Sequence, residues 1–175
     1  LWGANAVNGV INVITRTAHD TAGALLSAVA GEIENGASFR YGKVLDDVAF
    51  RVYGKVAEFG RSERPGALEF EDDWERVQIG FRADWRRGQD GFTLQGDAYD
   101  GRTGHRGFAG SFEFTPVTVS GANLLGRWQR DYSSGSQLQV QAYIDHTERD
   151  DALFYRPKAD ILDLDFQYAF DRGGH

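Results

Sequence analysis

The chain has 175 residues, a formal net charge of −7 at pH 7, 22 glycines and only 3 prolines, and 13% of its residues are aromatic. No run of about 18 apolar residues occurs, which excludes a transmembrane helix, and the absence of cysteine excludes disulfides and thiolate metal sites. The negative charge argues against a nucleic-acid partner, because such proteins attract phosphates with a surplus of lysine and arginine.

The first 21 residues differ in pattern from the remainder of the chain. Asn8-Gly9 is a strong turn pair. Residues 10–15 form a short β-branched run, which predicts a buried strand. Residues 16–21 are predicted to form a polar connector.

From residue 22 onward, eight segments are predicted to be strands, and apolar and polar residues alternate in most of them; residues 24–33 are apolar and small without a clear parity. In residues 137–147, one parity is wholly apolar, whereas amide, acidic and hydroxyl side chains occupy the other. Successive side chains of a strand point to opposite faces, so this segment is predicted to be a two-faced strand. Its length exceeds the roughly 5–6 residues of soluble strands and matches the roughly 9–11 that a tilted strand needs to cross a bilayer. The predicted strands lie at residues 24–33, 37–41, 50–57, 77–85, 92–98, 122–128, 137–147 and 162–170.

The predicted connections alternate in length. Short turns are expected near residues 46, 88, 134 and 173, and long links at 59–73, 100–117 and 148–160. A tight turn is predicted at Glu34-Asn35-Gly36. It is the exception, because the other links on that side of the predicted sheet are long. Short turns on one rim and long loops on the other are typical of outer-membrane barrels. We therefore predict an all-β fold, an antiparallel transmembrane β-barrel segment of the bacterial outer membrane, with a passive porin-like or small eight-stranded barrel and a soluble β-sandwich as alternatives.

Aromatic side chains gather at one end of the apolar parity. Trp85, Trp128, Tyr168 and Phe170 all lie beside short turns, where an outer-membrane protein carries a lipid-facing aromatic belt. In a soluble sandwich, the same residues would be ordinary core aromatics. The charged residues of the other parity would face a wet or plugged lumen in a barrel and solvent in a sandwich, and parity alone does not separate these two.

The start of the chain carries a more specific motif. Residues 1–16, Leu-Trp-Gly-Ala-Asn-Ala-Val-Asn-Gly-Val-Ile-Asn-Val-Ile-Thr-Arg, closely resemble the end of the plug domain of TonB-dependent outer-membrane receptors. The resemblance implies that residues 1–20 end the plug and residues 21–175 begin a barrel of about 22 strands in contact with outer-membrane lipids. It also implies active uptake of a chelated nutrient, such as a ferric siderophore, with energy from the TonB complex. The chain would then be a fragment of the receptor, expected to form an open, twisted sheet with residues 8–15 against its concave face.

No residues occur in a catalytic arrangement, so we expect neither enzymatic activity nor a cofactor or metal site. The most suggestive segment for ligand binding is a basic, glycine-rich loop that includes Arg102, His105, Arg106 and Phe108. Such a loop attracts anionic ferric chelates, and arginine offers them planar, multiple donors. The alternative is an exposed loop without a ligand.

Overall fold

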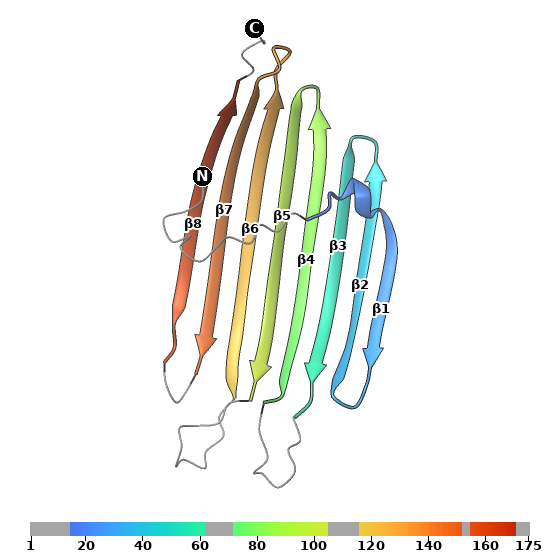
Figure 1. Ribbon diagram of the computed structural model, residues 1–175, viewed down its shortest axis with the longest axis vertical. Helices are drawn as coiled ribbons and strands as arrows, with labels where there is room; N and C mark the ends of the chain where they lie inside the picture. Colours follow the sequence, from blue (N-terminus) through green and yellow to red (C-terminus); the bar gives the residue numbers. More distant parts are fainter. Residues whose placement is uncertain (1–14, 62–71, 105–115, 152–154, 171–175) are drawn as a thin grey trace.

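The computed structural model describes residues 15–61, 72–104, 116–151 and 155–170. These residues form one antiparallel sheet of eight strands, in which each strand pairs with its neighbours in the sequence (Figure 1). Among these residues, no helix is long and apolar enough to cross a membrane. The prediction of eight antiparallel strands is confirmed.

The strands are long and follow one another as hairpins. A three-residue 3-10 helix, η1 (His19–Thr21), precedes them. The turns β2–β3, β4–β5 and β6–β7 lie at the upper end of the sheet, whereas β3, β5 and β7 end at the lower end (Figure 1). The strands are β1 (Gly23–Ala30), β2 (Glu34–Leu45), β3 (Val48–Phe59), β4 (Trp74–Arg87), β5 (Asp90–Thr103), β6 (Val117–Asp131), β7 (Gln137–Asp150) and β8 (Lys158–Ala169).

The register divides the sheet into two chemically different faces. Directly paired residues lie on the same face. One row, on what we call the apolar face, contains Ala24, Tyr41, Val52, Phe81, Gly96, Leu124, Ile144 and Leu162. The adjacent row, on the polar face, contains Leu25, Arg40, Tyr53, Gly80, Asp97, Asn123, Asp145 and Ile161. The two-faced pattern predicted for single strands therefore continues across the whole sheet.

The apolar face is largely uncovered. Within the described residues, the buried hydrophobic side chains are Ala18, Ala49 and Val117 alone. In contrast, Leu162 and Leu164 are 79% and 74% exposed. A β-sandwich would bury such a face under a second sheet, and the described residues contain only one sheet.

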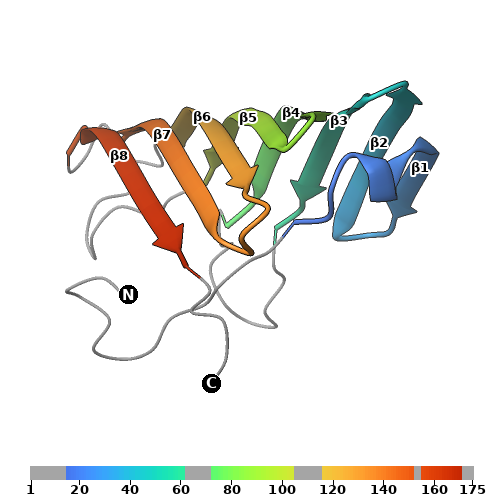
Figure 2. The same cartoon turned by 90° about the horizontal axis from the view of Figure 1, so that it is seen from above.

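The sheet is open, as expected. Among the described residues, β1 and β8 each pair on one side only, and they form its two opposite edges (Figure 2). Residues 8–15 were expected to lie against the sheet. Thr15 contacts Arg82 on the polar face, and residues 8–14 lie outside the described residues. The strand predicted at residues 10–15 lies outside them too, except for Thr15, and so does the turn predicted near residue 173.

The tight turn predicted at Glu34-Asn35-Gly36 is wrong. Strand β2 already begins at Glu34, and the hairpin loop lies just before it, at residues 31–33. Asn35 Oδ1 accepts a hydrogen bond from a loop amide at 3.3 Å, so this side chain closes the loop from within the strand. A Cβ at Gly36 would lie 2.9 Å from the Val56 carbonyl oxygen. This glycine therefore permits close approach of β3 and does not form a turn.

Two of the long links are shorter than predicted, because the strands continue beyond their apolar segments. Strand β5 extends to Thr103 and β7 to Asp150. At the end of β5, Arg102 pairs with Glu75 of β4. Backbone hydrogen bonds do not require apolar side chains, so the change to charged residues marks the end of the apolar face and not the end of the strands.

Candidate functional site

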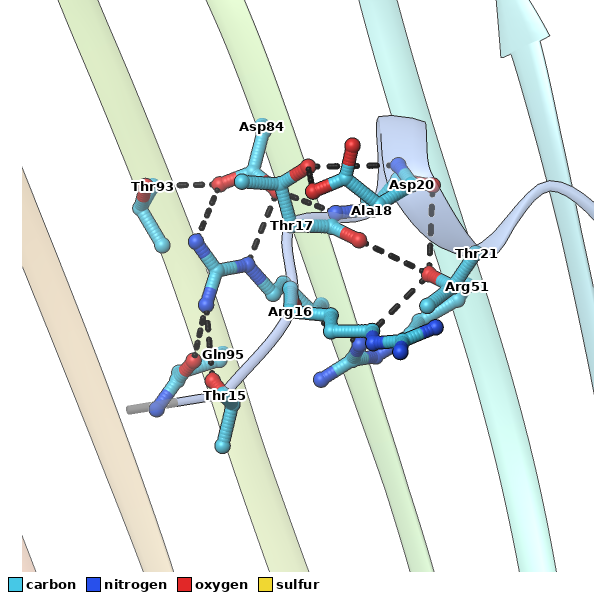
Figure 3. A network of polar contacts seen from close by, with 11 residues as sticks. Thr15, Arg16, Thr17, Ala18, Asp20, Thr21, Arg51, Asp84, Thr93 and Gln95 are labelled. Carbon is cyan, nitrogen blue, oxygen red and sulfur yellow. Dashed lines mark hydrogen bonds and ion pairs between the residues drawn. The ribbon is translucent and has the colours of Figure 1, made fainter. Parts of the chain in front are cut away.

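A polar network joins residues 15–22, which we call the connector, to the polar face of the sheet (Figure 3). Asp84 of β4 accepts four hydrogen bonds: from the Ala18 backbone N–H at 2.7 Å, from Arg82 Nε and Nη2 at 2.8 and 2.9 Å, and from Thr93 Oγ1 at 2.7 Å. The side chains of Arg82 and Asp84 are only 11% and 13% exposed. Both carboxylate oxygens are therefore used within the protein, and they link the connector to β4 and β5.

Two arginines extend this network along the connector. Arg82 Nη1 donates to Thr15 Oγ1 at 3.0 Å and to Gln95 Oε1 at 3.1 Å. Arg51 Nη1 donates to the Arg16 carbonyl oxygen at 2.8 Å. The register pairs Arg51 directly with Arg82, and like charges placed opposite each other repel. The acceptors around them offset this repulsion, so the connector and the arginines stabilise each other.

The connector is also ordered by local hydrogen bonds. Thr17 Oγ1 donates to Asp20 Oδ2 at 2.7 Å, and the Asp20 N–H donates back to Thr17 Oγ1 at 3.2 Å. Thr21 Oγ1 donates to the Thr17 carbonyl oxygen at 2.8 Å. The Thr17 hydroxyl lowers the pKa of Asp20 because it stabilises the charged carboxylate. The segment therefore meets the sheet as a defined turn around η1.

Next to the connector, the polar face contains a hollow of about 680 Å³. Its lining includes Thr15 and His19 from the connector and Arg82 and Arg127 from the sheet. Arg127 is held by Gln141 Oε1, which accepts from its Nε at 2.9 Å and its Nη2 at 2.6 Å. The connector therefore rests on a polar, basic surface instead of packing into an apolar core.

Of the four predicted ligand-binding residues, Arg102 lies in the described part of the chain. It belongs to β5 and not to a loop, and its Nε lies 3.3 Å from Glu75 Oε1. Both side chains are 55% exposed. Their positions in the register place them on the same side of the sheet as the apolar face. His105, Arg106 and Phe108 lie outside the described residues, so a ligand-binding role for the loop stays a prediction.

The predicted belt aromatics share one rim of the apolar face. Trp85 and Trp128 both pair with Phe92, and the Trp85 and Phe92 rings stack with centroids 5.2 Å apart. Tyr168 lies at the same end of β8, and its ring centroid is 6.2 Å from that of Phe170, just beyond the strand. Their shared position agrees with the sequence pattern. Contact with lipid stays a prediction.

The connector network was not identified from the sequence, although the charged residues of the polar parity, which include Arg51, Arg82 and Asp84, were expected to share one face. Within the described ranges, no group of three or more His, Asp or Glu side chains is arranged to hold a metal ion. No family model, curated protein or solved structure matches the chain. The resemblance of residues 1–16 to a receptor plug and the domain division at residue 20 therefore stay predictions.

Proposed function

We propose that the chain is part of a TonB-dependent outer-membrane receptor, in which residues 1–20 end the plug and residues 21–175 begin the β-barrel. The receptor takes up a chelated nutrient, with a ferric siderophore as the leading candidate, and the TonB complex supplies the energy. One observation carries the proposal: an eight-stranded sheet exposes an apolar face and binds a connector on its opposite, polar face.

A lipid environment accounts for the apolar face. A large apolar side chain left in water costs about 1.5–3 kcal/mol relative to burial, and Leu162, Leu164 and Phe166 are 79%, 74% and 68% exposed. Along β4 the apolar face extends from Val77 to Trp85, about 27 Å of strand. In a strand tilted by about 35–45°, this length spans about 20 Å of height, which is most of the ~25 Å apolar band of outer-membrane barrels.

A plug inside a larger barrel accounts for the polar face and the open edges. The polar face binds the backbone of the connector through Asp84 and Arg51, whereas the wall of a passive pore needs only water. An eight-stranded barrel has an interior just wide enough for its own side chains, which leaves no room for η1. Lipid does not tolerate unpaired backbone, so we infer that further strands pair with β1 and β8.

The test combines localisation with uptake. The full-length gene product is expressed in a Gram-negative host, and cells with and without it, and with and without TonB, are compared for uptake of a panel of labelled ferric chelates. We expect the protein in the outer-membrane fraction and uptake of at least one chelate that stops when either component is removed. Uptake without TonB would favour the passive pore, and a monodisperse soluble protein without detergent would refute the membrane location.

A further inference from the structure

A second hollow lies on the polar face, near the lower end of the sheet in Figure 1, where β3 ends and β4 begins. Its volume is about 330 Å³, and it is lined by Lys55 and Ala57 of β3 and by Trp74, Arg76 and Gln78 of β4. This volume falls at the lower end of the range for small-molecule pockets, roughly 300–1,000 Å³. The connector network lies further along β4, so the two sites are separate.

The hollow contains two positively charged side chains, those of Lys55 and Arg76. No ion pair joins Lys55 or Arg76 to an acidic residue within the described ranges. Lys55 of β3 pairs with Gln78 of β4, so Arg76 lies diagonally opposite Lys55. The two positive side chains therefore lie on neighbouring strands of one face. Glu58 and Glu75 adjoin this region in sequence, but they have the opposite parity and lie on the other face. Glu34 of β2 lies on the polar face and borders a neighbouring hollow with Lys55 and Trp74, but no ion pair joins it to Lys55 in the described residues. The hollow therefore attracts an anion.

The polar groups of the hollow are held in place by their neighbours. The Arg76 guanidinium carbon lies 4.3 Å from the centroid of the Tyr99 ring, a cation–π contact. Gln78 Nε2 donates a hydrogen bond to Tyr53 Oη at 3.2 Å. The amide oxygen of Gln78, Oε1, can then accept a hydrogen bond from a ligand. The arginine and the amide are therefore oriented before any ligand binds.

The hollow also offers a flat apolar surface. Trp74 stacks on Phe59 with ring centroids 6.0 Å apart and an interplanar angle of 2°. The Trp74 residue is still 39% exposed. One ring face stacks on Phe59, and the exposed part of the ring offers a flat ligand the stacked contact that aromatic rings favour.

We propose that Lys55, Arg76, Gln78 and Trp74 bind an aromatic carboxylate anion with an adjacent hydroxyl group. The carboxylate oxygens accept hydrogen bonds from Arg76 and Lys55, which act as a planar donor pair and a point charge. The hydroxyl group donates to Gln78 Oε1, and the ring lies against Trp74. The inference rests on the proposed function for the identity of the cargo, and it assigns this site as a contact at the outer mouth of the barrel.

Equilibrium dialysis of radiolabelled salicylate against the purified full-length protein tests the site. We expect saturable binding that Lys55→Gln and Arg76→Gln each weaken about fivefold, the effect of losing one exposed ion pair. Arg86→Gln is the matched control, because this arginine is exposed on the same strand and face and pairs instead with Asp131 at 2.9 Å. Benzoate, which lacks the hydroxyl group, should bind more weakly than salicylate.

Three results would overturn the inference: no salicylate binding, binding that neither substitution weakens, or equal binding of inorganic phosphate. The last result would show general attraction of anions without recognition of the ring. Direct binding requires neither TonB nor an energised membrane. If salicylate does not bind but TonB-dependent uptake is intact, this inference alone is refuted. If the protein is found outside the outer membrane, the proposed function is refuted.

Discussion

Replacement of Asp84 by alanine tests whether the connector is anchored to the sheet. The carboxylate accepts one hydrogen bond from the Ala18 N–H and three from Arg82 and Thr93. Removing one partner of a buried ion pair costs about 3–5 kcal/mol. We expect the lower end, about 3 kcal/mol, because Arg82 keeps two neutral acceptors.

Amide hydrogen exchange at Ala18 is the direct measurement of this anchor. Ala18 is fully buried, and its N–H donates to Asp84 Oδ2 at 2.7 Å. Loss of a hydrogen bond to a charged acceptor costs about 1.5–3 kcal/mol. Exchange at Ala18 in the Asp84→Ala variant should therefore become about 10- to 100-fold faster, as measured by mass spectrometry on the folded full-length protein.

Asp97→Ala is the matched control for this experiment. Asp97 lies on the polar face of the adjacent strand β5, and its Oδ1 has no hydrogen-bond partner among the described residues. Its charge attracts Arg51, but it makes no hydrogen bond to the connector in that part of the chain. This variant should leave exchange at Ala18 unchanged. If Asp84→Ala also leaves it within about twofold of the wild type while the strands stay protected, a change under 0.5 kcal/mol, the proposed anchor is refuted.

Three further substitutions test other features. In the proposed receptor Leu164 faces lipid, where an arginine costs about 2–4 kcal/mol, so Leu164→Arg should block assembly into the outer membrane, as measured by membrane fractionation. Gly80→Ala should lower the free energy of unfolding by about 1–3 kcal/mol, because its Cβ would collide with the Asp97 carboxylate and the Tyr53 ring, and thermal unfolding measures this. Thr17→Val should raise the pKa of Asp20 toward its ordinary value of 3.8, which NMR titration of the carboxyl group measures. Because the wild-type pKa is lowered, the stabilisation from this hydrogen bond is fully present above pH 3.8 and is lost as the pH falls through the folded-state pKa.

Each of these substitutions has its own control. Asp163→Arg, one position from Leu164 but on the polar face, should assemble normally, and equal behaviour of the two variants would contradict the assignment of faces. Asp97→Ala and Tyr53→Ala should each remove part of the effect of Gly80→Ala, because the Asp97 carboxylate oxygen and the Tyr53 ring are the groups that the added Cβ meets. A titration of Asp20 that Thr17→Val leaves unchanged would show that the hydroxyl is not the cause of the lowered pKa.

The strands were predictable because the period of two is a local property of each strand. Successive side chains of a strand point to opposite faces, so a strand between an apolar and a polar environment alternates in sequence. The alternation in residues 137–147 therefore identifies β7 without knowledge of its neighbours. The Asn35-Gly36 pair shows where local reasoning fails. A side chain at Gly36 would collide with the Val56 carbonyl oxygen, so the reason for this glycine lies in a different strand, β3.

The connector network was much less predictable. Parity assigned Arg82 and Asp84 to the polar face, but their contact with the connector joins Ala18 to a residue 66 positions later. No pattern in a single strand contains that information, because it depends on where the chain crosses the sheet. The hollow around Lys55 and Arg76 depends in the same way on the pairing of β3 with β4.

The sequence by itself determined the strands, the two faces and the rim at which the aromatic residues gather, because each follows from the order of side chains along one strand. The tertiary structure decided which side chains meet. Register is set by backbone hydrogen bonds along whole hairpins, and a shift of one residue would exchange the faces of a strand. Only that register brings Asp84 to Thr93 and the connector. Among the described residues, it also leaves Lys55 and Arg76 without an ion pair and the edges of β1 and β8 open.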